Sequence, residues 1–145
     1  PAYPSLLFFR HSATEMAIPA SAVAAVDMVG FTHRVPHRRN EHFRGLAVNE
    51  GSMVPLLTLE GLLGMPSVYE DDRVPRLVVM ESSSSGDRWC IIVDMVHGVD
   101  MCDPETWQQT DQWHPCAKHM IPSERGMVML LDPDELSSLT SGAFQ

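Results

Sequence analysis

Hydrophobic residues along this chain gather in short runs, and turn-forming residues separate one run from the next. The runs at 5–10 (SLLFFR), 43–49 (FRGLAVN), 53–59 (MVPLLTL) and 75–82 (PRLVVMES) are bounded by Gly, Pro, Asn or Ser. Runs of this length and composition are typical of β-strands. The run at 87–101 predicts one long strand or two, because its Val and Ile content disfavours a surface helix.

Turn and helix signals lie between these runs. Gly51 supplies the positive φ of a tight hairpin turn between 43–49 and 53–59. A short helical turn is predicted at 60–63, where Gly64 ends it. The segment 126–139 predicts a strand, a turn and a short helix, with Asp132 or Asp134 as the N-cap.

Three further segments carry weaker patterns. Residues 20–30 fit either a short helical turn or an irregular strand, while 31–44 is polar, contains a Pro, and predicts a surface loop. Residues 103–126 predict a long irregular stretch. Many short strands with regular turn signals and little helix indicate an all-β protein built from small closed barrels.

Composition restricts the class of protein. A chain of 145 residues suits one compact domain or two small intergrown lobes, and its net charge of -9 argues against a general nucleic-acid binder. Its odd number of Cys, three, favours reduced thiols in a cytoplasmic protein. No apolar run reaches the roughly 18 residues of a membrane span. Because the chain starts at Pro1 without Met, we expect a processed chain or an excerpt that lacks an N-terminal region.

Two groups of residues suggest a metal-dependent enzyme, such as a zinc hydrolase. His37, Glu41 and His42 resemble an H-x-x-E-H signature with one residue too many, and the polar surroundings favour a solvated basic loop instead. The second group mixes two Cys with two His, as tetrahedral zinc prefers: Cys102, His114, Cys116 and His119. Its spacing lacks paired knuckles, so surface His and packed Cys are the favoured interpretation.

No other catalytic arrangement stands out. Ser52 follows Gly51 in a predicted hairpin turn, whereas a nucleophile elbow joins a strand to a helix. Asp94, inside the apolar IIVDMV, is expected to face solvent because strand residues alternate. Several Met residues inside predicted strands are interpreted as core filler: Met53, Met80, Met95, Met127 and Met129. A basic stretch in this acidic chain indicates either a solvated loop or a docking site for an acidic partner: Arg34, Arg38, Arg39 and Arg44.

The order of the segments resembles the CheW-like family of chemotaxis adaptor domains nearly end to end. The matching segments follow one another as LLFFR, AIPASAVAAV, VPHRRNEHFRGLAVNEGSMVPLLTLEGLLG, RLVVME, WCIIVDMVHGV and GMVMLLDPDEL. The VPHRR and VDMVHGV segments are also similar to the divergent WspD-like proteins of surface-sensing pathways. The family pattern has an I-P stretch, a hairpin of the G-v-x-N-l-R-G type and a G-l-x-V-D-x-V strand.

This resemblance implies two intergrown five-stranded SH3-like barrels with short connecting and C-terminal helices, and no clean linear boundary within residues 1–145. It implies a cytoplasmic, non-catalytic bacterial adaptor without a cofactor. The implied partners are the regulatory domain of a CheA-type histidine kinase and the cytoplasmic tip of a methyl-accepting chemoreceptor, with no nucleic acid and no membrane insertion.

Departures from the family pattern concentrate at the hairpin. Glu50 stands where the family has the Arg of its N-L-R-G turn, Val48 where it has Asn, and Thr58 where it has Asp. Ala25 replaces a common acidic residue. The charge reversal at Glu50 predicts an altered interaction surface. The expected partner-binding residues are Val23, Ala25, Arg44, Asn49, Glu50, Gly51, Ser52, Val96, Gly98 and Val99.

Overall fold

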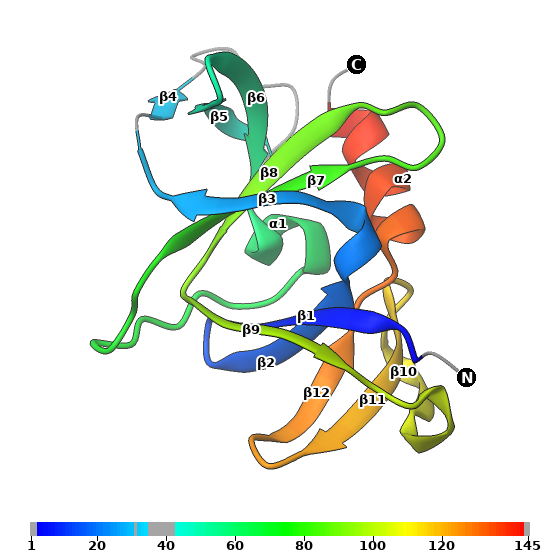
Figure 1. The fold of residues 1–145 in the computed structure, drawn as a ribbon. Coiled ribbons are helices and arrows are strands. Elements are labelled where there is room, and N and C mark those ends of the chain that lie inside the picture. Colours follow the sequence, from blue (N-terminus) through cyan, green and yellow to red (C-terminus); the bar gives the residue numbers. More distant parts are fainter. Residues whose placement is uncertain (1–2, 31, 35–42, 144–145) are drawn as a thin grey trace.

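The computed structural model describes residues 3–30, 32–34 and 43–143, and nearly all of their regular structure is β-strand. Two six-stranded sheets form two lobes, which are stacked one above the other in Figure 1. The all-β, two-lobed prediction is confirmed. Within the described residues each sheet has six strands, whereas the resemblance implied five.

The first lobe is sheet A, at the bottom of Figure 1. Its strands lie in the order β10-β11-β12-β2-β1-β9, and only the β12–β2 pair is parallel. Its bounds are β1 Ser5–His11, β2 Thr14–Pro19, β9 Met95–Met101, β10 Gln108–His114, β11 Ala117–Ser123 and β12 Gly126–Leu130.

The second lobe is sheet B, with the strand order β3-β7-β8-β6-β5-β4 and one parallel pair, β6–β8. Its bounds are β3 Val23–Met28, β4 Thr32–Arg34, β5 Phe43–Asn49, β6 Ser52–Leu57, β7 Arg76–Glu81 and β8 Arg88–Val93. Strands β3 and β9 are edge strands of their respective sheets.

The successive strands change from one sheet to the other twice. The chain leaves sheet A through the 3-10 turn η1 (Ala20–Ala22) and enters sheet B at β3. It returns at a single residue, Asp94, which separates β8 of sheet B from β9 of sheet A. The predicted long strand at 87–101 is therefore two strands in different sheets.

One hydrophobic cluster connects the lobes, and each lobe has a smaller one of its own. The shared cluster includes Phe9 of β1, Ile91 of β8 and Leu136 of the C-terminal helix, all of which are fully buried. Strand β7 is buried on both faces, since Val78 faces the shared cluster while Val79 faces the sheet B cluster. Each such side chain contributes roughly 1.5–3 kcal/mol on burial, so the shared cluster binds the lobes together.

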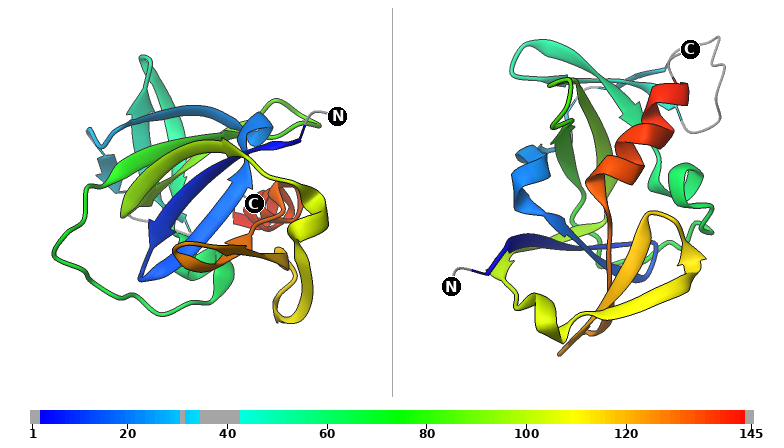
Figure 2. Two further views of the ribbon diagram at one scale, coloured as in Figure 1. Left: turned by 60° about the horizontal axis from the view of Figure 1, so that its bottom comes forward. Right: turned by 90° about the vertical axis from the view of Figure 1, so that its right-hand side faces the viewer.

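Short helices border the shared cluster. Helix α1 (Leu59–Leu63) is capped by the Thr58 hydroxyl, which accepts from the Gly61 amide, and it ends at Gly64 with a φ of 64°. Helix α2 (Pro133–Ala143) begins after Asp132, whose carboxylate accepts from the amides of Asp134 and Glu135. Figure 2 shows α2 running along one side of sheet B.

Sequence predictions for two segments are corrected. The stretch 103–126, predicted to be irregular, contains the 3-10 turn η2 (Pro104–Thr106) and the β10–β11 hairpin. Strand β10 is an edge strand with a polar sequence, QQTDQWH, so it lacks the apolar alternation that marks a half-buried strand. The segment 31–44, predicted to be a loop, contributes β4 and the start of β5.

Two methionines are not core filler. Met53 and Met127 are about half exposed, whereas Met80 is fully buried as predicted. Met53 lies at the tip of the β5–β6 hairpin and Met127 at the tip of the β11–β12 hairpin. Hairpin tips extend past the packed part of a sheet, so an apolar residue there finds no core to enter.

Candidate functional site

Asp94 is the centre of a polar junction between the lobes. The residue is only 6% exposed, and one carboxylate oxygen accepts from the Ser12 amide at 2.9 Å. Its own amide donates to the Arg10 carbonyl, and its carbonyl accepts from the Val74 amide at 2.8 Å. The prediction that Asp94 faces solvent is wrong, because this residue belongs to neither strand and the alternation of β8 ends before it.

His11, at the end of β1, lies between two carboxylates from different parts of the chain. Its Nε2 pairs with Oε1 of Glu60 on α1, and its Nδ1 lies 3.7 Å from Oδ1 of Asp94. The His11 side chain is 11% exposed. The hydrogen bond with His11 lowers the pKa of Glu60, and burial opposes this shift.

The turn that follows β1 is held in a left-handed conformation by these contacts. Ser12 and Ala13 have φ values of 48° and 61°, which cost non-glycine residues energy. The Ser12 amide is fixed by Asp94, and its hydroxyl accepts from the Val68 amide at 3.0 Å. The turn is therefore tied to both the crossover residue and the connector 66–75.

Arg10 forms ion pairs with the same connector, residues 66–75. Its guanidinium lies 3.3 Å from Glu70 and 3.0 Å from Asp72, both in the segment 66–75. The connector 66–75 thus carries carboxylates that pair with Arg10 of sheet A, while the segment itself leads into β7 of sheet B.

Residue types of a hydrolytic triad meet at this junction, but the contacts do not form one. Both nitrogens of His11 face carboxylates, and the Ser12 hydroxyl accepts from a backbone amide. A triad requires the imidazole to contact the hydroxyl as a base. The arrangement is therefore a structural ion-pair network beside a cavity of about 190 Å³ lined by His11, Glu60 and Asp94.

The β5–β6 hairpin ends in a two-residue turn. Asn49 pairs with Ser52 across it, and the central residues Glu50 and Gly51 have φ values of 50° and 78°. Positive φ at both positions is characteristic of a type I′ turn. Val48 and Met53 face each other one position back and are 40% and 50% exposed, so the tip presents an apolar pair.

Replacing Glu50 by Asn is expected to stabilise the protein by about 0.5–1 kcal/mol, since Asn tolerates positive φ better than Glu. Gly51→Ala is expected to cost about 1–2 kcal/mol, because nothing lies near the added Cβ and the cost comes from φ alone. Urea denaturation followed by circular dichroism measures both. Equal stability of the two variants would contradict the turn assignment.

The predicted partner-binding residues do not form one patch. Glu50, Gly51 and Ser52 share the hairpin tip, whereas Asn49 is 3% exposed and its amide group has no hydrogen-bond partner. Arg44 is exposed at the opposite end of β5 and lines the junction cavity.

The remaining predicted residues lie on the two edge strands. Val23 and Ala25 are half-buried on β3, and Val96 and Gly98 are half-buried on β9. Val23 and Val96 both pack against the shared cluster, while Val99 is 61% exposed. A bulge in β9 opposite Phe8 and Phe9 accompanies the positive φ of Gly98. The structure therefore brings the two edge-strand groups to the same core.

The proposed metal ligands are not assembled. No group of three or more Cys, His, Asp or Glu side chains within the described residues is placed to hold a metal ion. Cys102 accepts from the Trp107 indole, His114 accepts from the Cys116 amide, and His119 contacts the Trp107 ring. Burial raises the pKa of the Cys116 thiol to about 11, which disfavours the thiolate that zinc needs. His37, Glu41 and His42 lie outside the described residues, as do Arg38 and Arg39.

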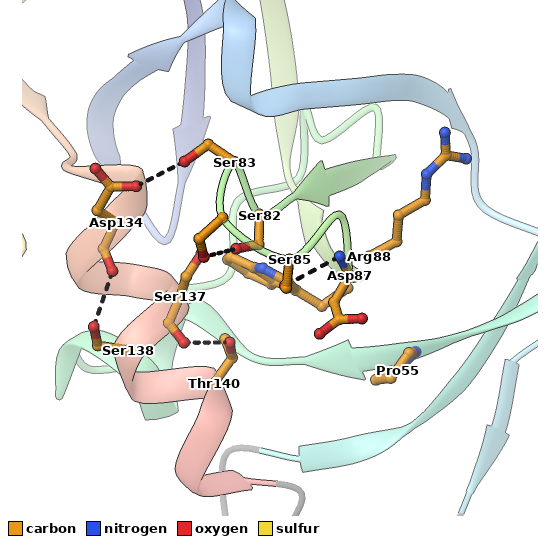
Figure 3. Close-up of a pocket in the computed structure, with 12 residues that line it drawn as sticks. Pro55, Ser82, Ser83, Ser85, Asp87, Arg88, Asp134, Ser137, Ser138 and Thr140 are labelled. Atoms are coloured by element: carbon orange, nitrogen blue, oxygen red, sulfur yellow. Dashed lines mark hydrogen bonds between the residues drawn. The ribbon is translucent and has the colours of Figure 1, made fainter.

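A larger cavity of about 810 Å³ lies between α2 and the β7–β8 loop (Figure 3). Ser83 donates to Asp134, and the loop serines and those of α2 face one another across the space. The described lining residues include no His or Cys, and the Ser83–Asp134 hydrogen bond is long, at 3.4 Å, and exposed. The described walls of this cavity are polar, and among them no hydroxyl is held by a base that a third group orients, as a catalytic triad requires.

Sequence reasoning missed the junction. The sequence pattern assigned no role to His11 or Ser12, and it placed Glu60 only in a short helical turn. The one available signal was Asp94 itself, a carboxylate in an otherwise apolar run, which requires a partner whenever it is buried.

The fold and these contacts define a small all-β protein of two intergrown SH3-like lobes joined by a polar junction. The CheW-like domain family matches residues 5–140. Among solved structures, the crystal structure of the scaffolding protein TtCheW from Thermoanaerobacter tengcongensis is similar, with a TM-score of 0.79 and 16% identity. That likeness covers 94% of this chain and 88% of the other. A comparison with curated protein sequences found no match.

The chain belongs to the CheW-like domain family. This is a family of non-enzymatic scaffold proteins, and it places the chain in the chemotaxis scaffold or adaptor class. Within the described residues no helix has the length and apolar character needed to traverse a bilayer.

Proposed function

We propose that this chain is a non-catalytic adaptor that couples the cytoplasmic tip of a methyl-accepting chemoreceptor to the regulatory domain of a CheA-type histidine kinase. The observation that carries this proposal is the pair of edge strands, β3 and β9, which flank the shared hydrophobic cluster and expose apolar side chains. The whole chain acts as one adaptor unit in the cytoplasm.

Both edge strands are suited to pairing with another protein. Their outer backbone groups have no neighbouring strand within the described sheets. Val26 and Met28 on β3, and Val99 and Met101 on β9, are exposed. Strand addition at such an edge gains main-chain hydrogen bonds and buries the apolar side chains. Barrels homologous to these lobes are therefore suitable partners.

Val99→Asp is expected to weaken kinase or receptor binding at least about tenfold, because it introduces a charge at the core of the contact. Met127→Asp is the matched control: Met127 is 45% exposed but lies on the β11–β12 hairpin, away from β3 and β9. Isothermal titration of each variant with the kinase regulatory domain and with a receptor-tip peptide measures the effect. Absence of wild-type binding at roughly tens of micromolar would reject the proposed function.

A substitution at the tip of the β5–β6 hairpin distinguishes a coupling adaptor from a module that no longer binds the kinase. Glu50→Arg restores the family charge without adding backbone strain, since both residues carry the same cost at positive φ. If the kinase contact persists at this tip, we expect wild-type binding and at most a modest change with arginine. If the tip no longer binds the kinase, arginine improves binding and the wild-type chain serves as an array interface or a competitor.

The acidic charge of the chain supports protein partners over nucleic acid. The narrower resemblance to WspD-like proteins stays a prediction, and it assigns the receptor and kinase to a surface-sensing pathway.

A further inference from the structure

We propose that protonation of His11 controls how firmly the two lobes are coupled, so that the junction around Asp94 is a pH-sensitive clasp. This inference does not depend on which partner the chain binds. It rests on three groups that come from separate elements: His11 at the end of β1, Glu60 on α1 and Asp94 at the crossover.

Because His11 lies between two carboxylates, its charge determines how strongly it attracts Glu60 and Asp94. Nε2 of the imidazole contacts Glu60, and Nδ1 is 3.7 Å from Asp94 with no closer hydrogen-bond partner. A protonated imidazole donates at both nitrogens and is attracted by both carboxylates. A neutral imidazole has only one N–H, so one carboxylate then faces a lone pair and the two anions lose the cation between them.

Other charged groups around His11 do not replace that cation. Arg10 is engaged with Glu70 and Asp72 of the connector. Arg44 of β5 and Arg73 of the connector line the same cavity, and the charge of Arg44 acts on Glu60. Glu15 of β2 pairs with His97 of β9 and also acts on Arg10. Of the described residues, only His11 lies within ion-pair distance of both Glu60 and Asp94.

The contacts of His11 are linked, through Asp94, to hydrogen bonds of the backbone that join the lobes. Asp94 accepts from the Ser12 amide, Ser12 accepts from the Val68 amide, and the Asp94 carbonyl accepts from the Val74 amide. A shift of the Asp94 carboxylate away from a neutral His11 strains its bond with the Ser12 amide directly. The other two bonds are made by Ser12 and by the Asp94 backbone, so they loosen as these two residues move. The cavity of about 190 Å³ beside His11 gives solvent protons a route to the ring.

Glu60 determines how the stability of the junction changes at acidic pH. Its pKa is lowered chiefly by the bond with His11, so its contribution to stability is complete above its ordinary value of 4.5 and is lost as the pH falls through the lowered value. Histidine side chains change charge between about pH 5 and pH 8. The clasp is closed while the imidazole of His11 carries its second proton and opens when that proton is lost.

Hydrogen exchange of the full ¹⁵N-labelled chain, measured by NMR at about pH 6 and about pH 8, tests this. We expect the protection factors of Ser12, Val68 and Val74, corrected for intrinsic exchange, to fall about tenfold at the higher pH. His11→Gln keeps a neutral hydrogen-bonding side chain, and the difference between the two pH values should disappear.

A matched control is available in His97. Its Nε2 lies 3.0 Å from Glu15, and both residues belong to sheet A, so this His–carboxylate pair lies within one lobe. His97→Gln should leave the pH response of the three junction amides intact. Unchanged protection of the wild-type junction between the two pH values, or a response that persists in His11→Gln, would overturn the proposal. The wild-type profile decides the question even if His11→Gln does not fold.

Discussion

Asp94→Ala is expected to lower the free energy of unfolding by about 3–5 kcal/mol, since it removes a buried carboxylate and leaves the groups that contact it unpaired. The substitution removes the acceptor of the Ser12 amide and one of the two anions beside His11. The Ser12–Ala13 turn, with both φ values positive, also loses the bond that holds it. Urea denaturation monitored by circular dichroism measures the loss.

Two comparisons identify the cause of that loss. Asp94→Asn keeps the shape and one acceptor oxygen, so it should cost less, about 1–3 kcal/mol. Asp72→Ala removes a carboxylate whose side chain is 65% exposed and pairs with Arg10, and surface pairs contribute less than about 1 kcal/mol. If Asp94→Ala were as mild as Asp72→Ala, the junction would be dispensable for folding.

Phe9→Ala should cost about 3–5 kcal/mol and should destabilise both lobes together. Phe9 belongs to sheet A, but its ring is buried in the cluster that also contains residues of sheet B. Ile91→Ala, from the sheet B side of the same cluster, should cost about 2–5 kcal/mol. Because the lobes share this cluster, each variant is expected to unfold in one transition.

Single-tryptophan reporters test whether the lobes unfold together. Trp89 lies on β8 of sheet B, and Trp107 precedes β10 of sheet A. One reporter keeps Trp89 with the other two tryptophans changed to Phe, and the other keeps Trp107. In Phe9→Ala the two reporters should give the same urea midpoint. A midpoint that falls only for Trp107 would mean that the lobes fold independently.

Two further variants make the comparison specific. Leu6 belongs to a cluster formed only by sheet A, and Val79 to one formed only by sheet B. Changing either residue to Ala provides a perturbation confined to one lobe. If these variants also give coincident midpoints, the shared cluster and the junction couple the lobes strongly.

Local patterns were sufficient for most of the strands. Strand β1 and the β5–β6 hairpin were predicted correctly because each combines an apolar run with a turn signal inside a few residues. For the same reason, the positive φ of Gly51 and the end of the helical turn at Gly64 were predicted correctly. Strand β10 was missed because a polar edge strand is stabilised by its neighbour, and its own residues carry no periodic signal.

The sequence by itself determined that this chain forms short strands, what family pattern they follow, and which hairpin departs from it. Only the tertiary structure decided that Asp94 is buried and that His11 lies between Asp94 and Glu60, since His11 is 49 positions from Glu60 and 83 positions from Asp94 in the sequence. A sequence pattern reports which way a side chain points from its own strand. Whether a carboxylate is buried with a partner depends on where the chain crosses from one sheet to the other, and that is fixed by packing between distant segments.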